Sequence, residues 1–368
     1  MQKVMAVFGT RPEAIKMAPL VLALKKDKDI DCVFVSTGQH KEMLKQVLDL
    51  FEITPDYDLD IMKTSQSLSS ITTSIIIGLD KVLETEKPDI VLVHGDTSTS
   101  FAAALSAFYH QIPVGHVEAG LRTYDKYSPF PEEMNRCLTG RLADYHFAPT
   151  ENNKNNLLKE GISEDKIYVT GNTVIDALKL VVEKPYEFEN DVLKNLDFSN
   201  KKVVAVTCHR RENLGENMHS IFSAIAEVAK EEPDTEFVYP VHLNPAVRNS
   251  AEKYLEGIKN VHLIEPLQYQ EFVNLMAKSY LILTDSGGMQ EEGPALAKPV
   301  VVVRKETERP EAVKAGTVLL AGVEKENVKN ALIKLLTDRN EYDKMAKAVN
   351  PYGDGKAVER IVGIIKES

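Results

Sequence analysis

The sequence has no tryptophan, few cysteines and no long apolar run, and the last two of these features each argue against a class of protein. It has no tryptophan and only three cysteines, Cys32, Cys137 and Cys208, which are widely separated and show no CxxC spacing. This pattern argues against a disulfide framework or a zinc cluster, and it suits a reducing compartment. Because no apolar run is long enough for a signal peptide or a membrane span, we expect a soluble cytoplasmic protein with no membrane partner.

Positive charge is also scarce. The chain carries 55 acidic and 44 basic side chains, so its formal net charge is −11. This balance argues against a general nucleic-acid binder, although it leaves room for a local basic pocket that binds a small anion. The dinucleotide-binding fingerprint GxGxxG is absent as well. A chain of 368 residues exceeds what one hydrophobic core usually organises, so two domains are expected.

Short apolar runs alternate with helix-like segments along most of the chain. The predicted buried strands are 4–8, 31–36, 89–93, 113–117, 145–148 and 167–170, and then 202–206, 236–241, 261–264, 280–283 and 299–303. This alternation predicts an α/β fold with parallel sheets that are covered on both faces. We expect domains at 1–170 and 171–350, and a final helix within 351–368 that packs back across the domains.

Reactive side chains gather directly after the predicted strands. They are Arg11 and Glu13, His40, Asp96, Glu118, the segment 209–212, His242, Ser286 and Arg309. In open parallel sheets, ligands bind beyond the carboxyl ends of the strands. Two such sheets that face each other would pool both sets of side chains in one cleft. This convergence favours an enzyme over a structural protein.

One strand-to-helix turn in the second half has the composition of an anion site. The segment 284–288 reads Thr-Asp-Ser-Gly-Gly and is followed by a helix-like pattern. Paired glycines allow a ligand to approach the backbone closely, and the free N–H groups of a helix start favour phosphate. Ser286 adds a hydroxyl donor, and Glu292 can accept hydrogen bonds from sugar hydroxyls. The structural alternative is an ordinary turn in which Asp or Ser caps the helix.

The other candidates also have structural interpretations. Asp96 could cap a helix, Glu118 could form a salt bridge with Arg122, and Glu132 could complement a helix dipole. His209 could simply donate a hydrogen bond to a backbone carbonyl. The residues taken singly leave these alternatives open.

A series of ordered motifs covers essentially the whole chain. They are Gly9-Thr10-Arg11-Pro12-Glu13, His94-Gly95-Asp96-Thr97, His116-Val117-Glu118-Ala119-Gly120-Leu121-Arg122, Pro131-Glu132-Glu133-Met134-Asn135-Arg136, Gly171-Asn172-Thr173, His209-Arg210-Arg211-Glu212-Asn213 and Thr284-Asp285-Ser286-Gly287-Gly288. In this order they resemble the non-hydrolysing UDP-N-acetylglucosamine 2-epimerases. The resemblance implies a glycosyltransferase-B-like fold, in which two Rossmann-like domains enclose an active-site cleft.

The same resemblance implies a reaction and its residues. UDP-N-acetylglucosamine and UDP-N-acetylmannosamine would interconvert, without cofactor or metal, by elimination of UDP to 2-acetamidoglucal and re-addition. The implied catalytic residues are Asp96, Glu118, Glu132 and His209, and the implied substrate-binding residues are Arg11, Lys16, Phe272, Ser286, Gly287, Gly288 and Glu292. Which group removes the C2 proton stays open. A hydrolysing relative, a glycosyltransferase of the same fold and a non-catalytic sensor remain the alternatives.

Some members of this family have a second UDP-N-acetylglucosamine site that activates the enzyme. The residues that match its positions are Gln39, His40, Gln66, Arg210 and His242. However, Glu42 and Ser65 stand where Gln and Arg would be expected, and a carboxylate that faces a diphosphate is unfavourable. We therefore expect weaker substrate activation than in regulated relatives. The family also implies a homodimer.

Overall fold

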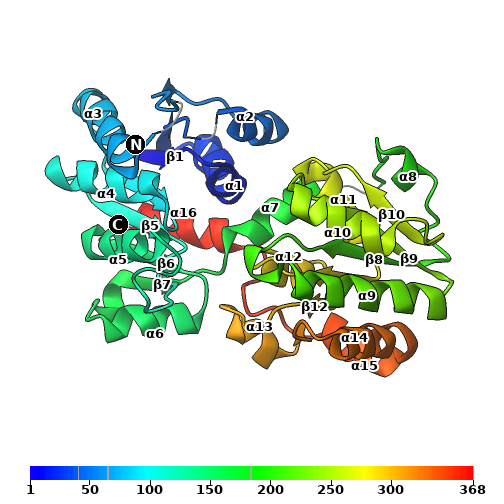
Figure 1. Cartoon of the computed structure of the whole chain (residues 1–368). Helices are drawn as coiled ribbons and strands as arrows, with labels where there is room; N and C mark the ends of the chain where they lie inside the picture. Colours follow the sequence, from blue (N-terminus) through cyan, green and yellow to red (C-terminus); the bar gives the residue numbers. More distant parts are fainter. Residues whose placement is uncertain (40, 64–65, 183–184, 368) are drawn as a thin grey trace. The chain divides into compact units, whose positions relative to one another are not determined.

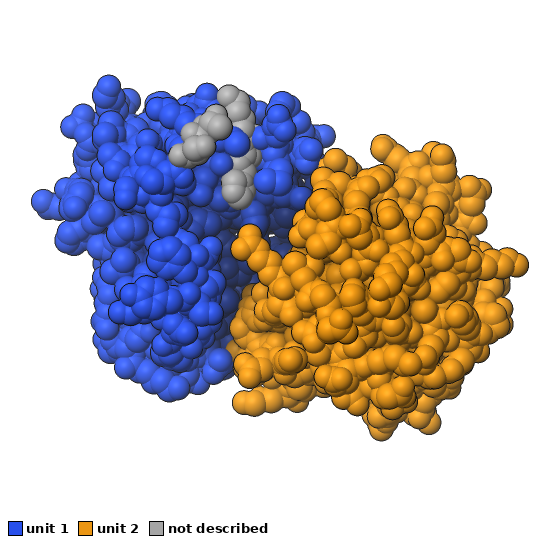
Figure 2. All heavy atoms as spheres, viewed as in Figure 1, with its two compact units in different colours: residues 1–180, 352–368 blue, residues 181–351 orange. Residues whose placement is uncertain are grey.

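The chain folds into two compact units, as shown by a computed structural model that describes residues 1–39, 41–63, 66–182 and 185–367. Unit 1 comprises Met1–Leu180 and Tyr352–Ser368, and unit 2 comprises Val181–Pro351 (Figure 2). Each unit contains one parallel sheet, so the predicted α/β class with two parallel-sheet domains is confirmed. His40 and Ser65 lie outside the described residues.

Unit 1 is built on a seven-stranded sheet with the order β3-β2-β1-β4-β5-β6-β7, of which Figure 1 labels β1, β5, β6 and β7. Its strands are β1 (Gln2–Phe8), β2 (Ile30–Ser36), β3 (Tyr57–Asp58), β4 (Ile90–His94), β5 (Val114–Val117), β6 (Tyr145–Ala148) and β7 (Ile167–Val169). Its helices are α1 (Arg11–Lys26), α2 (Lys41–Leu50), α3 (Leu68–Glu86), α4 (Ser98–Tyr109), α5 (Glu132–Leu142), α6 (Glu151–Lys159), α7 (Thr173–Val181) and α16 (Ala357–Glu367). The central strand β1 is buried from Val4 to Phe8, as expected for a parallel strand with both faces covered.

The final helix belongs to unit 1. The carboxylate of Asp176 on α7 accepts hydrogen bonds from the backbone N–H groups of Ala357 (3.3 Å) and Val358 (3.1 Å), which begin α16. At the other end of α16, Lys366 pairs with Asp27 at 3.0 Å. These contacts join α16 to α7 and to the end of α1, and unit 1 extends to Leu180, past the boundary expected at residue 170.

Unit 2 is built on a six-stranded parallel sheet with the order β10-β9-β8-β11-β12-β13. Its strands are β8 (Lys202–Thr207), β9 (Thr235–Pro240), β10 (Val261–Ile264), β11 (Leu281–Thr284), β12 (Val300–Val302) and β13 (Val318–Leu320). Its helices are α8 (Asp191–Lys194), α9 (Glu216–Glu231), α10 (Pro245–Leu255), α11 (Tyr269–Lys278), α12 (Met289–Ala295), α13 (Pro310–Ala315), α14 (Lys325–Thr337) and α15 (Arg339–Ala346).

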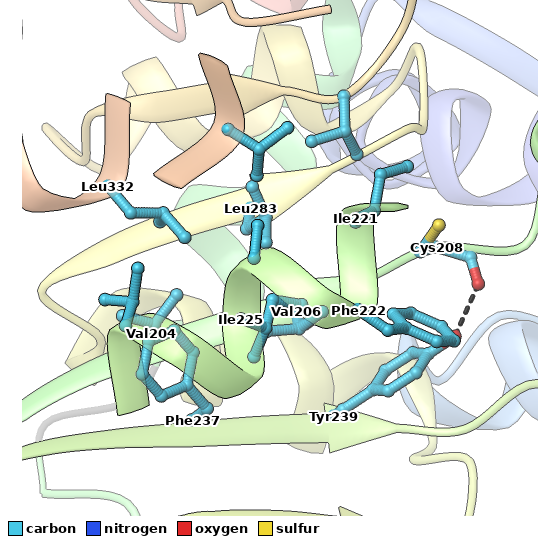
Figure 3. Packing of buried hydrophobic residues seen from close by; sticks show 14 of the residues in the cluster. Val204, Val206, Cys208, Ile221, Phe222, Ile225, Phe237, Tyr239, Leu283 and Leu332 are labelled. Atoms are coloured by element: carbon cyan, nitrogen blue, oxygen red, sulfur yellow. Dashed lines mark hydrogen bonds between the residues drawn. The ribbon is translucent and has the colours of Figure 1, made fainter. Parts of the chain in front are cut away.

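The core of unit 2 reaches the edge of the sheet where the polar loops begin. Figure 3 shows Val204 and Val206 of β8 packing among side chains of α9, β9 and β11. At one end of this cluster, the hydroxyl of buried Tyr239 donates a hydrogen bond to the backbone carbonyl of Cys208. The first residue beyond β8 is therefore anchored to the core, and the loop that carries His209 starts from a fixed point. Among the described helices, none is both long and apolar enough to cross a membrane.

Candidate active site

Glu118 is the most constrained candidate in unit 1. It follows β5 and has a left-handed backbone conformation, with φ of 61°. Its carboxylate forms an ion pair with Lys16 of α1, and it accepts a hydrogen bond from Nδ2 of Asn172 at 3.0 Å. His94 Nε2, at the end of β4, lies 3.8 Å from the other carboxylate oxygen. A non-glycine residue at positive φ costs on the order of 1 kcal/mol or more, and such strain clusters at functional sites.

The structural interpretation of Glu118 as a partner of Arg122 is wrong. Arg122 instead donates to Glu160, with 2.6 Å between Nε and Oε1. Lys16, in the helix after β1, and Asn172, which follows β7, hold the Glu118 carboxylate, and His94 at the end of β4 lies beside it, so three strand ends of one sheet converge on it. This is the arrangement predicted for a site at the carboxyl edge of the sheet.

Buried histidines surround this edge. Burial lowers the pKa of His94 to about 4, although the nearby Glu118 carboxylate acts in the opposite direction. Burial also lowers the pKa of His116 to about 3, and His116 Nε2 lies 2.7 Å from the carbonyl oxygen of Gly95. Both imidazoles are therefore neutral near pH 7, so Lys16 is the cation that faces Glu118.

Asp96 is held by α5. Its carboxylate forms an ion pair with Arg136, and its backbone carbonyl accepts from Asn135 Nδ2 at 3.0 Å. Arg136 also pairs with the buried Glu133, at 3.1 Å. The cap of α4 is Thr97, which accepts from the N–H of Ser100, so the helix-cap interpretation of Asp96 is wrong.

Two other predicted residues of unit 1 lie at helix starts. Glu132 is the first residue of α5 and is half-buried, a position that also suits a partner of the helix dipole. Arg11 begins α1 and is half-buried, with no ion pair to any described residue. Glu13, in contrast, is buried and accepts from the N–H groups of Gly9 (3.1 Å) and Thr10 (2.8 Å). Glu13 therefore stabilises the start of α1.

Asp285 organises the candidate residues of unit 2. Its side chain is fully buried in the turn after β11, and Oδ2 accepts from the backbone N–H groups of His209 and Arg210, both at 2.8 Å. Asn213 Nδ2 donates to the same oxygen at 3.1 Å. The loop after β8 is thereby joined to the neighbouring loop after β11. Asp285 belongs to one of the sequence motifs, but this role was not predicted, although a carboxylate directly after a buried strand was the available signal.

His209 and His242 lie side by side in unit 2. Their rings stack with centroids 5.1 Å apart and planes 16° apart. Burial lowers the pKa of His209, the Asp285 carboxylate opposes this change, and His242 and Arg210 add to the lowering. The His209 ring stays partly accessible, since 41% of its side chain is exposed. His209, which was predicted to be catalytic, and His242, which was predicted for a second site, therefore lie on one surface.

The turn that contains Gly287 is bordered by arginines. A Cβ atom at this position would lie 3.3 Å from Oε1 of Glu308 and 3.4 Å from Nη2 of Arg210, so only glycine fits without displacing a side chain. Arg304, Arg309 and Arg210 all pair with Glu308. Burial would raise the pKa of Glu308, but these guanidinium charges outweigh it and lower the pKa to about 2. Arg304 also pairs with Glu212 and Arg309 with Glu291, so the turn lies against a network of arginines and carboxylates.

The helix after this turn is not capped by a side chain. The first residue outside α12 is Gly288, and neither Asp285 nor Ser286 caps the helix, so that structural interpretation is wrong. The backbone N–H of Ser286 donates to Thr284 Oγ1 at 2.9 Å. Glu292 is buried on α12, and Phe272 is half-buried on α11. No group of residues that could hold a metal ion occurs among the described residues.

The residues predicted for a second site are divided between the units. Gln39 accepts from Thr99 Oγ1 at 2.9 Å, and Gln66 Nε2 donates to the carbonyl of Ile61 at 2.6 Å, both in unit 1. Arg210 and His242 belong to unit 2. Glu42 lies on α2 with an exposed side chain. These positions leave the second site a prediction.

Comparison with known proteins identifies the family. A family model described as UDP-N-acetylglucosamine 2-epimerase matches residues 22–366. The UDP-N-acetylglucosamine 2-epimerase of Bacillus subtilis is 58% identical over 360 residues, which cover 98% of this chain and 94% of that protein.

Solved structures agree with this result. The Neisseria meningitidis UDP-GlcNAc 2-epimerase bound to UDP-GlcNAc is 55% identical, with a TM-score of 0.88 and 100% of both chains covered. The S. aureus MnaA-UDP co-structure is 51% identical, with a TM-score of 0.89, covering 100% of this chain and 96% of that chain. The resemblance seen in the sequence is confirmed: the chain belongs to the UDP-N-acetylglucosamine 2-epimerase family.

Proposed function

We propose that this protein interconverts UDP-N-acetylglucosamine and UDP-N-acetylmannosamine by inverting C2 of the sugar. Family membership over residues 22–366 supports the reaction, and the N. meningitidis relative bound to UDP-GlcNAc supports the substrate. The observation that carries the proposal is the strained Glu118, whose carboxylate is fixed by Lys16 and Asn172 at the edge of the first sheet. A carboxylate held in this way is suited to proton transfer.

The reaction we propose proceeds through elimination. A base removes the C2 proton, the C–H electron pair forms the C1–C2 double bond, and the C1–O bond breaks with its electrons leaving on UDP. Protonation of the resulting 2-acetamidoglucal at the opposite face of C2, with return of UDP to C1, gives the epimer. Because UDP returns, no water is consumed and the enzyme is of the non-hydrolysing type. Positioned acid–base groups contribute roughly a hundred- to ten-thousand-fold to such a reaction.

We propose roles in this reaction for polar residues of each unit. Asp96, Glu118, Glu132 and His209 would carry out proton transfer, with Lys16 tuning the carboxylates. Ser286, Gly287, Gly288 and Arg11 would bind the diphosphate, Glu292 the ribose and Phe272 the uracil. The guanidinium group of Arg210 beside Gly287 supports this division, because donors of this kind can neutralise the charge of a leaving diphosphate.

Proton NMR in deuterated water tests this function. Incubation with UDP-N-acetylglucosamine should yield UDP-N-acetylmannosamine that carries deuterium at C2, and Glu118→Gln should slow the exchange by at least about a hundredfold. Release of free N-acetylmannosamine with UDP would identify a hydrolysing enzyme instead. Unchanged substrate without exchange at C2 would indicate a transferase or a sensor.

We also propose that the protein forms a homodimer. Family membership suggests it, and large apolar side chains are exposed on α3 and α4, with Ile77 and Tyr109 each 64% exposed and Phe108 56% exposed. Such side chains mark a protein contact where they form one contiguous patch. Sedimentation should give twice the mass of one chain, and the double variant Ile77→Asp/Phe108→Asp should give monomers. A monomeric parent protein would contradict the proposal.

A further inference from the structure

Asn172 uses all of its polar groups at the edge of the first sheet. Its Nδ2–H donates to Oε1 of Glu118 at 3.0 Å, and its Oδ1 accepts from the N–H of Val174 at 3.0 Å. Its backbone N–H donates to the carbonyl of Tyr352 at 2.7 Å. Only one amide orientation satisfies both side-chain contacts, since the carboxylate must accept and the N–H of Val174 must donate.

The residue is also sterically confined. Asn172 is 3% exposed and Tyr352 is 4% exposed, so both partners of the backbone hydrogen bond are buried. Tyr352 is the first residue of the segment that returns to unit 1 after unit 2. Because Asn172 is buried and is held through its backbone N–H and its Oδ1, its Nδ2 can move little. Nδ2 therefore stays directed at Glu118.

We propose that Asn172 is a positioning residue for Glu118, and that its amide group fixes the carboxylate in the geometry that proton transfer needs. The inference rests on the proposed function, in which Glu118 acts on the substrate. Among the contacts described above, Lys16 of α1 and His94 of β4 also face this carboxylate, and Asp96 lies near His94. Lys16 supplies charge but is a flexible point donor, whereas the Asn172 amide is held in place at two further atoms.

Two variants separate this role from the capping of α7. Asn172→Asp keeps an oxygen for the N–H of Val174 but replaces the donor to Glu118 with a second carboxylate. In Asn172→Ser the hydroxyl can still accept from the N–H of Val174, but the side chain is too short to reach Glu118. This variant therefore also tests the loss of the donor to Glu118 if the aspartate variant does not fold. The matched control is Asn190→Asp, because Asn190 caps α8 through the N–H groups of Val192 and Leu193, far along the chain from this site.

The expected result is a loss in kcat with little change in KM. A carboxylate that is misplaced by a fraction of an ångström loses roughly ten- to a hundredfold in rate, and KM should stay within about twofold. Loss of a hydrogen bond to the charged form makes Glu118 harder to ionise, so the acid limb of the kcat profile should move up by about one pH unit in Asn172→Ser. The shift should be larger in Asn172→Asp, where two carboxylates adjoin, and absent in Asn190→Asp.

A second measurement does not depend on turnover. Carbon-13 NMR of protein labelled at the glutamate carboxyl groups, with Glu118→Gln for assignment, follows the titration of Glu118 directly. A midpoint that rises in Asn172→Ser supports the proposal, and a midpoint and acid limb identical to those of the parent protein in a folded variant overturn it. If the parent protein shows no exchange at C2, the proposed function fails, while this titration still decides whether Asn172 fixes Glu118.

Discussion

The imidazole rings of His209 and His242 stack with their centroids 5.1 Å apart. The two residues follow different strands, β8 and β9, and meet because these strands are neighbours in the sheet. A change at His242 should therefore alter His209, even though the sequence suggested separate roles for them.

Replacement of His242 should lower activity through His209. His242→Ala removes the stacking surface and a group that lowers the pKa of His209, so we expect kcat to fall about three- to tenfold and the His209 titration to move to higher pH. His242→Phe retains a ring and should keep most of the activity. Steady-state kinetics between pH 5 and 9 make the comparison, and equal kcat values for the parent and the alanine variant would contradict it.

Removal of Asp285 should destabilise unit 2 and inactivate the protein. In Asp285→Ala the backbone N–H groups of His209 and Arg210 lose a buried acceptor, which should cost about 3 kcal/mol in the free energy of unfolding. Urea denaturation measures this loss. Asp191→Ala is the control, because the Asp191 side chain is 97% exposed and its removal should change stability by less than about 0.5 kcal/mol.

Gly95→Ala should affect catalysis more than stability. Gly95 has φ of 65°, and a Cβ atom there would lie 3.2 Å from Oε2 of Glu118. Gly161 has φ of 81° with nothing within 4 Å of its Cβ position, so Gly161→Ala reproduces the backbone strain alone. Both variants should lose about 1 kcal/mol of stability, and only Gly95→Ala should lower kcat. Equal activities in the two variants would exclude this effect on Glu118.

The free energy of unfolding should fall steeply between pH 6.5 and 4. Burial lowers the pKa of His94 to about 4, of His116 to about 3 and of His146 to about 4. Below pH 6.5 the unfolded chain binds protons that the folded chain does not, so stability is lost as the pH falls, by about 2 kcal/mol for each imidazole at pH 5.

His146→Asn isolates part of this effect. Asparagine does not titrate, so the dependence of the unfolding free energy on pH should be shallower than in the parent protein, whatever other groups contribute. Burial raises the pKa of Glu13, which acts in the opposite direction in both proteins and cancels in the comparison. Chemical denaturation at pH 7 and pH 5 measures the unfolding free energy of both proteins. If it changes equally with pH in the parent protein and in the variant, His146 titrates normally in the folded state.

Substrate activation should be weak. Rates measured against UDP-N-acetylglucosamine concentration should be close to hyperbolic, and Glu42→Gln should increase any sigmoidal character, because it removes a negative charge that would repel the diphosphate. Strongly sigmoidal rates in the parent protein, abolished by Arg210→Ala, would show that the second site is fully active.

Local patterns predicted the main elements of the fold. The predicted strand 202–206, for example, matches β8 (Lys202–Thr207) within one residue. The strands β3 and β13 were missed because they contain two and three residues and are defined by pairing with β2 and β12, which no local pattern reveals.

The partners of the candidate residues were much harder to foresee. Asn172 and Glu118 are separated by 54 residues, and His209 and Asp285 by 76. Which side chains meet at a sheet edge depends on strand order, and the order in unit 1 places β4 beside β1 rather than beside β3. The sequence therefore predicted which residues lie at strand ends, while their pairing required the folded sheet.

Unit 1 is assembled from two pieces of chain, because Tyr352–Ser368 joins Met1–Leu180 only after all of unit 2 has been made. During synthesis, unit 2 can close on the growing chain while unit 1 still lacks α16 and the carbonyl that anchors Asn172. The segment Tyr352–Ser368 is thus translated after unit 2 and completes unit 1, and translation that stops before it should leave Asn172 without the backbone contact that helps it to hold Glu118.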